Sequence, residues 1–226
     1  MSLNVLRVNA PANATASIII LHGLGDSAHG WSFLSELLHH NPSFQHVNLI
    51  FPNAPIKPLT CANGQRISQW FDIYEMGNPN AKMDEDGYWT NVSKVNNLIE
   101  NEVNNGIDAS KIIVGGFSQG ASLSLGVAAS YEKKLAGILS LSGFFAMKHG
   151  IKTRLTDANK STPIYHGHGD CDPVIGIEYA RMTAKYFKEE LGFTDYTLKE
   201  FPNMAHSTCN EEMQDIIEFF KKNLDL

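Results

Sequence analysis

The sequence predicts one α/β domain, residues 1–226, with a mostly parallel central β-sheet and helices on both of its faces. Short segments rich in β-branched residues alternate along the chain with longer segments of helical periodicity. That alternation is the pattern of a parallel sheet covered by its connecting helices. The length suits a single domain. In addition, no internal repeat, low-complexity tract or Ser/Gly-rich linker divides the chain.

An antiparallel edge strand over Leu3–Val8 is the first expected element. The segments with strand signals are short, apolar and β-branched, as buried strands are: Ser17–Leu21, Val47–Phe51, Lys111–Val114, Leu135–Leu141, Pro163–His168 and Tyr196–Glu200. The helical segments lie between them and after the last: Trp31–His40, Asp86–Asn105, Gln119–Tyr131, Ile177–Leu191 and Glu211–Leu224. In open α/β sheets ligands bind at the carboxyl ends of the strands, so the functional residues are expected in the connections that leave them.

Two connections are too long for simple alternation. Pro52–Gly87 contains several prolines together with aromatic residues, and connections of this length in compact domains are usually lids or binding loops. Phe144–Thr162 has no clear periodicity, and we expect a solvated surface connection there.

Composition argues against several classes of function. The formal net charge of −6 leaves no basic footprint for a nucleic-acid partner. No secretory leader is visible at the N-terminus, and the apolar runs are too short to span a bilayer. The three cysteines form neither an even framework nor a C-x-x-C pair, which fits a reducing compartment. We therefore expect a cytoplasmic location that can extend to the nucleus.

The stretch from Ile112 to Leu123 carries the first candidate for chemistry. A β-branched strand ends in Gly116-Phe-Ser118-Gln-Gly120, and small apolar residues of a helix follow. The pattern Gly-x-Ser-x-Gly is typical of a nucleophile elbow, in which a sharp strand-to-helix turn lifts the Ser hydroxyl above the sheet. The alternative is a tight turn in which Ser118 caps the helix.

A loop after the first buried strand has two interpretations. Gly23-x-Gly25-x-x-Ala28 matches the fingerprint of dinucleotide-binding proteins. However, no acidic residue ends the next strand to bind a ribose, and Asp26 would repel a pyrophosphate. The alternative is an oxyanion hole, with one donor from the main chain of Leu24 and a second from the main chain of Gln119 in the elbow.

A nucleophilic serine needs a histidine base and an acid that orients it, and in hydrolases with an elbow the chain order is Ser, acid, His. Of the nine histidines, only His206 follows the candidate acids. These acids are Asp170 and Asp172, and their spacing does not separate them. The run His166-x-His168-x-Asp170 also resembles ligands of two-metal hydrolases, but no second ligand cluster is apparent. We expect no metal and no cofactor.

Several blocks of this sequence resemble, in the same order, the acyl-protein thioesterases, which belong to the phospholipase/carboxylesterase group of small α/β-hydrolases. The blocks are Leu21-His22-Gly23-Leu24-Gly25-Asp26, Phe51-Pro52-Asn53-Ala54-Pro55, Trp70-Phe71-Asp72, Gly115-Gly116-Phe117-Ser118-Gln119-Gly120, His166-Gly167-His168-Gly169-Asp170-x-Asp172-Pro173-Val174 and Met204-Ala205-His206-Ser207. The resemblance implies an α/β-hydrolase fold. It also implies Ser118 as nucleophile, Asp172 as acid and His206 as base, with Leu24 and Gln119 as oxyanion donors.

The same resemblance implies a serine hydrolase that removes long-chain fatty acids from S-acylated protein cysteines. Lysophospholipids or simple carboxylesters are the alternative substrates, and transient contact with a membrane surface and a weak homodimer are further expectations. The resemblance places an apolar acyl channel in the long connection, with these candidate residues: Leu59, Trp70, Phe71, Ile73 and Met76. Ordinary core packing is the alternative for such side chains.

Two functions of other classes are alternatives to a hydrolase. A hydrolase-fold protein can keep its site and only bind a ligand, because fold does not fix function. The Gly-rich loop keeps a dinucleotide-dependent oxidoreductase as a further alternative.

Overall fold

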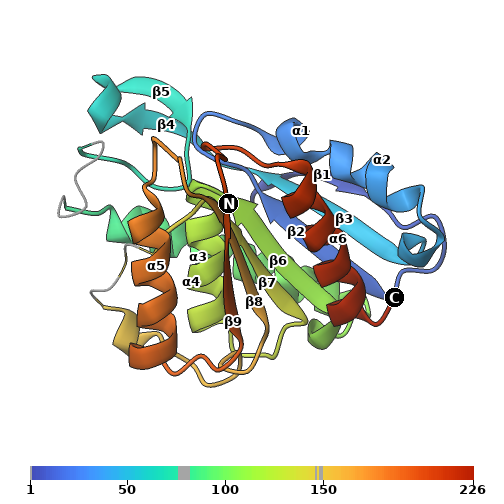
Figure 1. Ribbon diagram of the computed structural model, residues 1–226. Coiled ribbons are helices and arrows are strands. Elements are labelled where there is room, and N and C mark those ends of the chain that lie inside the picture. The colour runs from blue at the N-terminus through green and yellow to red at the C-terminus, as the bar shows by residue number, and fades with distance from the viewer. Residues whose placement is uncertain (1, 76–81, 146, 148–149) are drawn as a thin grey trace.

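The structure, a computed structural model, describes residues 2–75, 82–145, 147 and 150–226. Its centre is a seven-stranded sheet in the order β1-β3-β2-β6-β7-β8-β9 (Figure 1). The strands are β1 (Asn4–Val8), β2 (Ala16–Leu21), β3 (Val47–Asn53), β6 (Ile112–Phe117), β7 (Gly137–Leu141), β8 (Ile164–Gly169) and β9 (Tyr196–Phe201). Strand β1, at one edge, runs antiparallel to β3, and every other neighbouring pair is parallel.

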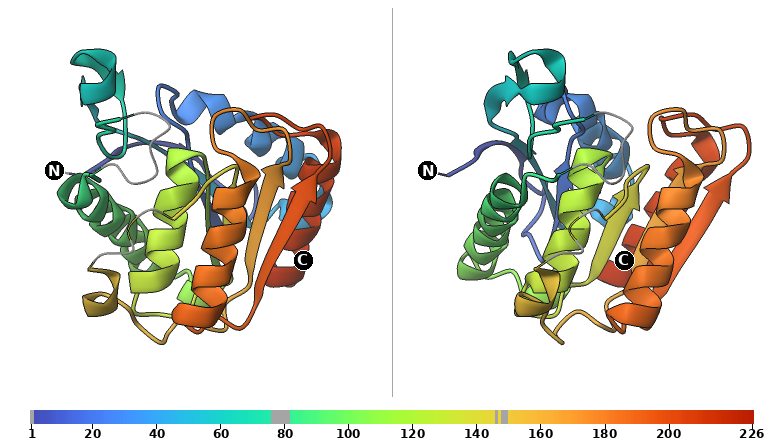
Figure 2. Two further views of the ribbon diagram at one scale, coloured as in Figure 1. Left: turned by 60° about the vertical axis from the view of Figure 1, so that its left-hand side comes forward. Right: turned by 90° about the vertical axis from the view of Figure 1, so that its left-hand side faces the viewer.

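Helices cover both faces of this sheet (Figure 1, Figure 2). The α-helices are α1 (Ala28–Trp31), α2 (Phe33–His39), α3 (Glu85–Asn104), α4 (Gln119–Ser130), α5 (Ile177–Lys185) and α6 (Asn210–Leu224). Helices α3, α4 and α5 lie on one face, and α1, α2 and α6 lie on the other. The shorter helical turns are 3-10 turns at Pro42–Phe44, Thr60–Ala62, Ala109–Lys111 and Ile151–Thr153 and a π-helical turn at Tyr186–Glu190.

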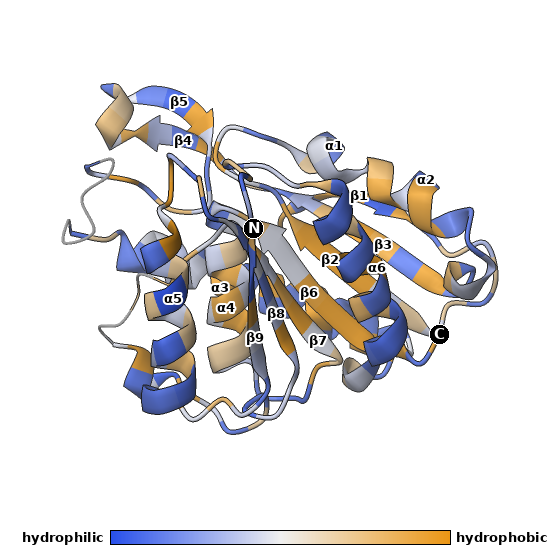
Figure 3. Cartoon of the chain, viewed as in Figure 1, coloured by the Kyte–Doolittle hydropathy of each residue, from blue (hydrophilic) through white to orange (hydrophobic). Residues whose placement is uncertain are grey.

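Alternate side chains of β2 show how the core divides. Ile18 and Ile20 belong to the apolar cluster under α1, α2 and α6, whereas Ile19 and Leu21 belong to the cluster under α3, α4 and α5. A strand buried on both faces must be apolar at every position. Strand β2 is buried throughout and appears orange in Figure 3, whereas the edge strand β9 is partly exposed and appears largely blue, as does the outer face of α6. Within the described residues, no helix is both long and apolar enough to cross a bilayer.

The predicted sheet, its antiparallel edge strand and its covering helices are confirmed, with differences at the ends of elements. The segment predicted as one helix over Trp31–His40 forms α1 and α2, which meet at Ser32. The strand predicted from Leu135 begins at Gly137, because the side chain of Asn159 accepts the N–H of Leu135 and holds that residue in a loop.

The long connection after β3 contains an antiparallel hairpin made of β4 (Ile56–Leu59) and β5 (Gln65–Ser68), which projects from the body of the protein (Figure 1). Asn63 and Gly64, with φ of 53° and 78°, make its turn. The sequence did not predict this hairpin, because Pro58 lies inside β4 and proline argues against a strand. A two-stranded sheet consists only of edge strands, and edge strands tolerate proline.

The expectation of a solvated connection over Phe144–Thr162 is wrong. Phe145 and Ile151 are buried in the core, and Asn159 is fully buried as well. The Asn159 amide donates to two carbonyl groups and accepts one N–H of the loop between α4 and β7. Buried main-chain groups need such partners, and one polar side chain provides three here. The segment therefore packs without any periodicity that the sequence could show.

Glu212, in the first turn of α6, is a fully buried carboxyl group. Among the described residues, neither of its carboxyl oxygens has a hydrogen-bond partner. A Cβ atom at Gly167 in β8 would lie 2.1 Å from one of them, so the glycine makes the space that the carboxyl group occupies. Burial, with a smaller contribution from the charge of Asp215, raises the pKa of Glu212 to about 8.

The Glu212→Gln variant is expected to gain stability over the parent as pH rises. The folded-state pKa of Glu212, about 8, exceeds the ordinary value of 4.5. Its contribution to folding is therefore complete below pH ~4.5 and is lost as pH rises towards ~8, by up to about 1.4 kcal/mol per pH unit. Glutamine does not titrate. Urea unfolding at pH 5, 6.5, 8 and 9 measures the difference.

The control is Glu211→Gln, whose parent side chain is 63 % exposed. Its unfolding free energy should follow that of the parent closely at every pH. Parallel stability profiles for the Glu212→Gln variant and the parent would contradict the account of Glu212.

Candidate active site

Ser118 lies in the predicted turn between β6 and α4, with φ of 54° and ψ of −116°. Its flanking glycines leave no room for a side chain. A Cβ at Gly116 would lie 2.3 Å from the carbonyl carbon of Gly120, and a Cβ at Gly120 would lie 2.2 Å from the carbonyl oxygen of Leu21. The Ser118 side chain makes no capping hydrogen bond to α4, so the geometry favours the elbow over the helix cap.

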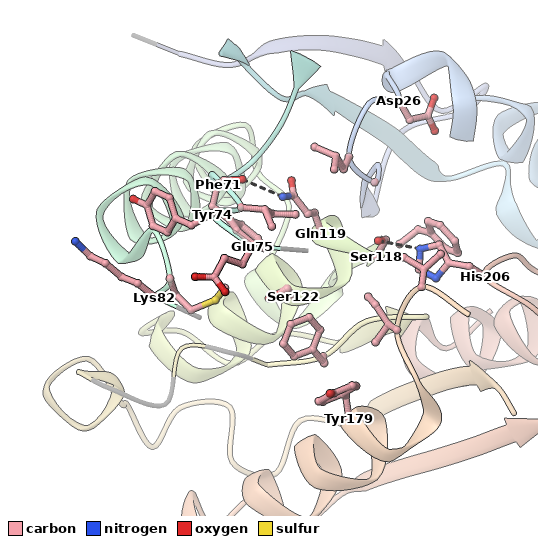
Figure 4. Close-up of a pocket in the computed structure, with 18 residues that line it drawn as sticks. Asp26, Phe71, Tyr74, Glu75, Lys82, Ser118, Gln119, Ser122, Tyr179 and His206 are labelled. Atoms are coloured by element: carbon pink, nitrogen blue, oxygen red, sulfur yellow. Dashed lines mark hydrogen bonds between the residues drawn. The ribbon is translucent and has the colours of Figure 1, made fainter. Parts of the chain in front are cut away.

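A chain of hydrogen bonds joins Ser118, His206 and Asp172. Nε2 of His206 lies 3.0 Å from Oγ of Ser118, and Nδ1 lies 2.7 Å from Oδ2 of Asp172 (Figure 4 shows the first of these bonds). The other carboxylate oxygen of Asp172 accepts the N–H groups of Val174 and Ile175, at 2.8 and 2.9 Å. Nδ1 of the imidazole therefore donates, and Nε2 is left as the acceptor that faces the serine hydroxyl.

The structure separates the two candidate acids. Asp172 is buried and faces His206, whereas Oδ1 of Asp170 accepts the N–H of Asn203 at 2.7 Å, in the turn that follows β9. Asp170 thus holds the loop that carries the histidine, and Asp172 contacts the imidazole.

The two histidines of the run in β8 are buried and bond to other groups of the fold. His166 accepts from the Tyr196 hydroxyl at Nδ1 and donates to the Gly143 carbonyl from Nε2. Burial, with a smaller effect of the neighbouring His168, lowers the pKa of His166 to about 3. His168 is also buried, and its Nε2 donates to the Ile175 carbonyl at 2.8 Å. His168 thus supports the loop that follows the acid, and His166 joins β9 to the loop after β7.

The two predicted oxyanion loops come together at Ser118. A Cβ at Gly23 would lie 3.3 Å from Cβ of Ser118, so the loop after β2 lies close to the serine side chain. Leu24 in that loop and Gln119 in the elbow line the same cavity as Ser118. Gln119 is the first residue of α4, and the first N–H groups of a helix have no partner within the helix. Such an N–H is available to an anion at this point.

An apolar cavity of about 330 Å³ opens at Ser118 and His206 (Figure 4). Phe71 and Ile73, predicted for the acyl channel, line it. Leu59 and Trp70 do not: both are buried elsewhere in the core, where large apolar side chains gain most from leaving water. Met76 lies outside the described residues.

Tyr74 and Met83, from the same long connection, also line the cavity. Other parts of the chain contribute residues that the sequence did not predict: Phe117, Phe144, Val174, Ile175 and Tyr179. Phe117 precedes the nucleophile candidate directly, and its ring lies 4.8 Å from that of His206. Val174 and Ile175 follow the acid, so their position beside the motif was a usable signal. No signal in the sequence pointed to Tyr179 and Phe144, because the packing of a helix and of a loop brings them to the site.

Comparison with known proteins shows the family of this chain. The profile of the phospholipase/carboxylesterase family matches residues 4–224. The chain belongs to this family. It is 41 % identical to acyl-protein thioesterase 1 of Kluyveromyces lactis over 228 residues, which is 100 % of both chains.

Solved structures of similar proteins agree with the family assignment. That of Arabidopsis thaliana SOBER1 superposes with a TM-score of 0.85 at 29 % identity and covers 92 % of this chain and 99 % of its own. That of Zea mays acyl-protein thioesterase 2 has a TM-score of 0.83 at 25 % identity, over 98 % and 99 %. The predicted α/β-hydrolase fold is thus confirmed, and with it the resemblance that the sequence blocks indicated.

Proposed function

We propose that this member of the phospholipase/carboxylesterase family is a serine hydrolase that cleaves long-chain fatty acyl thioesters from protein cysteines. The observation that carries the proposal is the hydrogen-bonded chain Asp172–His206–Ser118 at the mouth of an apolar cavity. The similarity to two acyl-protein thioesterases, those of K. lactis and Z. mays, supports it.

The reaction we propose begins with attack of the Ser118 hydroxyl on the thioester carbonyl. Nε2 of His206 takes the hydroxyl proton, and the carboxylate of Asp172 stabilises the imidazolium that forms. The N–H groups of Leu24 and Gln119 donate to the oxyanion of the tetrahedral intermediate. Collapse of that intermediate breaks the C–S bond, and the imidazolium returns its proton to the leaving thiolate. Water, deprotonated by His206, then hydrolyses the acyl-enzyme.

The lining of the cavity supports a long acyl chain as the substrate group. Aromatic and aliphatic side chains such as Phe71, Ile73 and Tyr179 surround it. Burial of one methylene contributes about 0.8 kcal/mol, so eight methylenes contribute ~6 kcal/mol, more than a short ester can gain. Because the hydrolytic residues are the same for thioesters and oxygen esters, lysophospholipids are the second candidate substrates.

A parallel assay separates these substrates. Purified protein is given a palmitoylated cysteine peptide, a lysophosphatidylcholine and a short nitrophenyl ester, and kcat/KM is measured for each. The proposal predicts the highest kcat/KM for the peptide. A higher value for the lysophospholipid would assign the protein to the alternative activity, and no turnover of any substrate would indicate a protein that only binds its ligand.

A cytoplasmic location, transient contact with membrane surfaces and a weak homodimer are further parts of this proposal. The acyl-protein substrates supply the reason for the membrane contact, because their acyl chains reside in lipid. Sedimentation at several protein concentrations tests the homodimer, since a weak dimer dissociates on dilution.

A further inference from the structure

We propose that the segment Ser68–Phe71 fixes the distance between the two halves of the oxyanion hole, with the side chains of Trp70 and Gln119 as its positioning groups. This inference rests on the proposed function, in which Leu24 and Gln119 supply the oxyanion donors. It gives Trp70 a role that differs from the predicted one in the acyl channel. We call residues 68–71 the bridging segment.

One side of the bridging segment holds the loop after β2. The N–H of Gly25 donates to the carbonyl of Ser68 at 2.8 Å, and Nε1 of Trp70 donates to the carbonyl of His22 at 2.7 Å. The rings of His22 and Trp70 also pack together, with centroids 5.3 Å apart. Leu24 lies between the two residues that are held, so its N–H takes its position from these bonds.

The ring of His22 adds further hydrogen bonds that hold the loop after β2. The N–H of Ala54 donates to its Nε2, which leaves Nδ1 protonated and donating to the Gly23 carbonyl at 2.7 Å. Burial lowers the pKa of His22, so the ring stays neutral and keeps this tautomer. The main chain on the N-terminal side of Leu24 is thus held by side chains as well as by the bridging segment.

The other side of the bridging segment holds the elbow. Oε1 of Gln119 accepts the N–H of Trp70 at 3.0 Å, and Nε2 of Gln119 donates to the carbonyl of Phe71 at 2.9 Å (Figure 4 shows the second of these bonds). The amide thus makes paired bonds to consecutive residues of the bridging segment. Gln119 is 5 % exposed and Trp70 is fully buried, so water does not compete for these groups.

These contacts tie both proposed donors to one short piece of backbone. An oxyanion hole acts only when its donors lie 2.7–3.1 Å from the place where the negative charge develops. A misplacement of ~1 Å costs about 100-fold in rate. The hydrogen bond from Asn91 Nδ2 to the Trp70 carbonyl attaches the bridging segment to α3, which makes it a rigid reference for the two loops.

Trp70→Phe tests the inference because it keeps a buried aromatic ring and removes the indole N–H that holds His22. We expect kcat to fall by about 10- to 100-fold with little change in KM. The inhibition constant of a long-chain trifluoromethyl ketone, which forms an oxyanion on Ser118, should rise by the same factor. Binding of the corresponding long-chain alcohol, which forms no oxyanion, should stay as in the parent.

The matched control is Trp89→Phe. Trp89 is also buried, and its indole N–H has no hydrogen-bond partner among the described residues, so its loss removes no contact to the loops. Gln119→Met is the second variant: it keeps the main-chain donor, removes both amide bonds to the bridging segment and should lower kcat and ketone affinity together. This variant decides the matter if Trp70→Phe does not fold.

The inference is overturned if Trp70→Phe and Gln119→Met match Trp89→Phe in kcat and in ketone affinity. It is also overturned if the two variants raise KM and weaken binding of the alcohol, and binding of the ketone weakens only by that same factor. Trp70 would then act on the acyl chain. These outcomes differ from failure of the proposed function, in which Ser118→Ala would retain hydrolysis.

Discussion

Ser118→Ala is expected to lower kcat for a long-chain acyl thioester by about 10⁶-fold, because removal of the serine from a hydrogen-bonded Ser-His-Asp set costs about this much. The hydroxyl is the only group of the set that can form the acyl-enzyme. The other partners should stay in place, since His206 remains bonded to Asp172 and alanine fits the space of serine. Thioester hydrolysis followed by thiol release, with the uncatalysed rate subtracted, measures the loss.

Ser130→Ala is the control for this variant. Ser130 lies at the far end of α4 from Ser118, and its hydroxyl donates to the Gly126 carbonyl within that helix. We expect turnover like that of the parent. If Ser118→Ala retained more than about one hundredth of the parent activity, the serine would not be the nucleophile.

Asp172→Asn is expected to lower kcat by about 10⁴-fold through the tautomer of His206. The N–H groups of Val174 and Ile175 both donate to Oδ1 of Asp172, so the amide oxygen of asparagine takes that position and the NH₂ group faces the imidazole. Nδ1 must then accept, and Nε2 carries the proton towards Ser118. A protonated Nε2 cannot act as the base.

Asp170→Asn is the matched control, because asparagine can still accept the N–H of Asn203 through its carbonyl oxygen. Its kcat should stay within a few-fold of the parent value. Comparison of the two variants at equal folded concentration, verified by circular dichroism, measures the difference. Equal losses in both variants would show that the acid loop acts only through its fold.

The sequence predicted those parts of the site that depend on the order of residues along the chain. The elbow at Gly116, Ser118 and Gly120 could be predicted because an apolar strand comes before it and a helix comes after it. His206 followed from its position after the candidate acids. By contrast, Asp170 and Asp172 leave the same strand, and the spacing could not show which of them faces the imidazole. The hydrogen bonds of Oδ1 and Oδ2 made that distinction.

The acyl channel was harder to predict because apolar side chains are ambiguous. Trp70 and Phe71 are neighbours, yet Phe71 lines the cavity and Trp70 packs in the core and bonds to His22. Both residues lie in a bend after β5, where residue spacing does not show which side chain points into the cavity. Phe144 and Tyr179 reach the cavity only through the packing of a loop on α5.

The account as a whole requires a covalent intermediate on Ser118. The most direct test mixes the parent protein with a palmitoyl thioester, stops the reaction with acid within milliseconds and locates the acyl group by peptide mass spectrometry. We predict one palmitoyl group per chain, on the peptide that contains Ser118, and its disappearance in Ser118→Ala. Turnover with no acyl group on that peptide, or with the acyl group on a cysteine such as the exposed Cys171, would contradict the account.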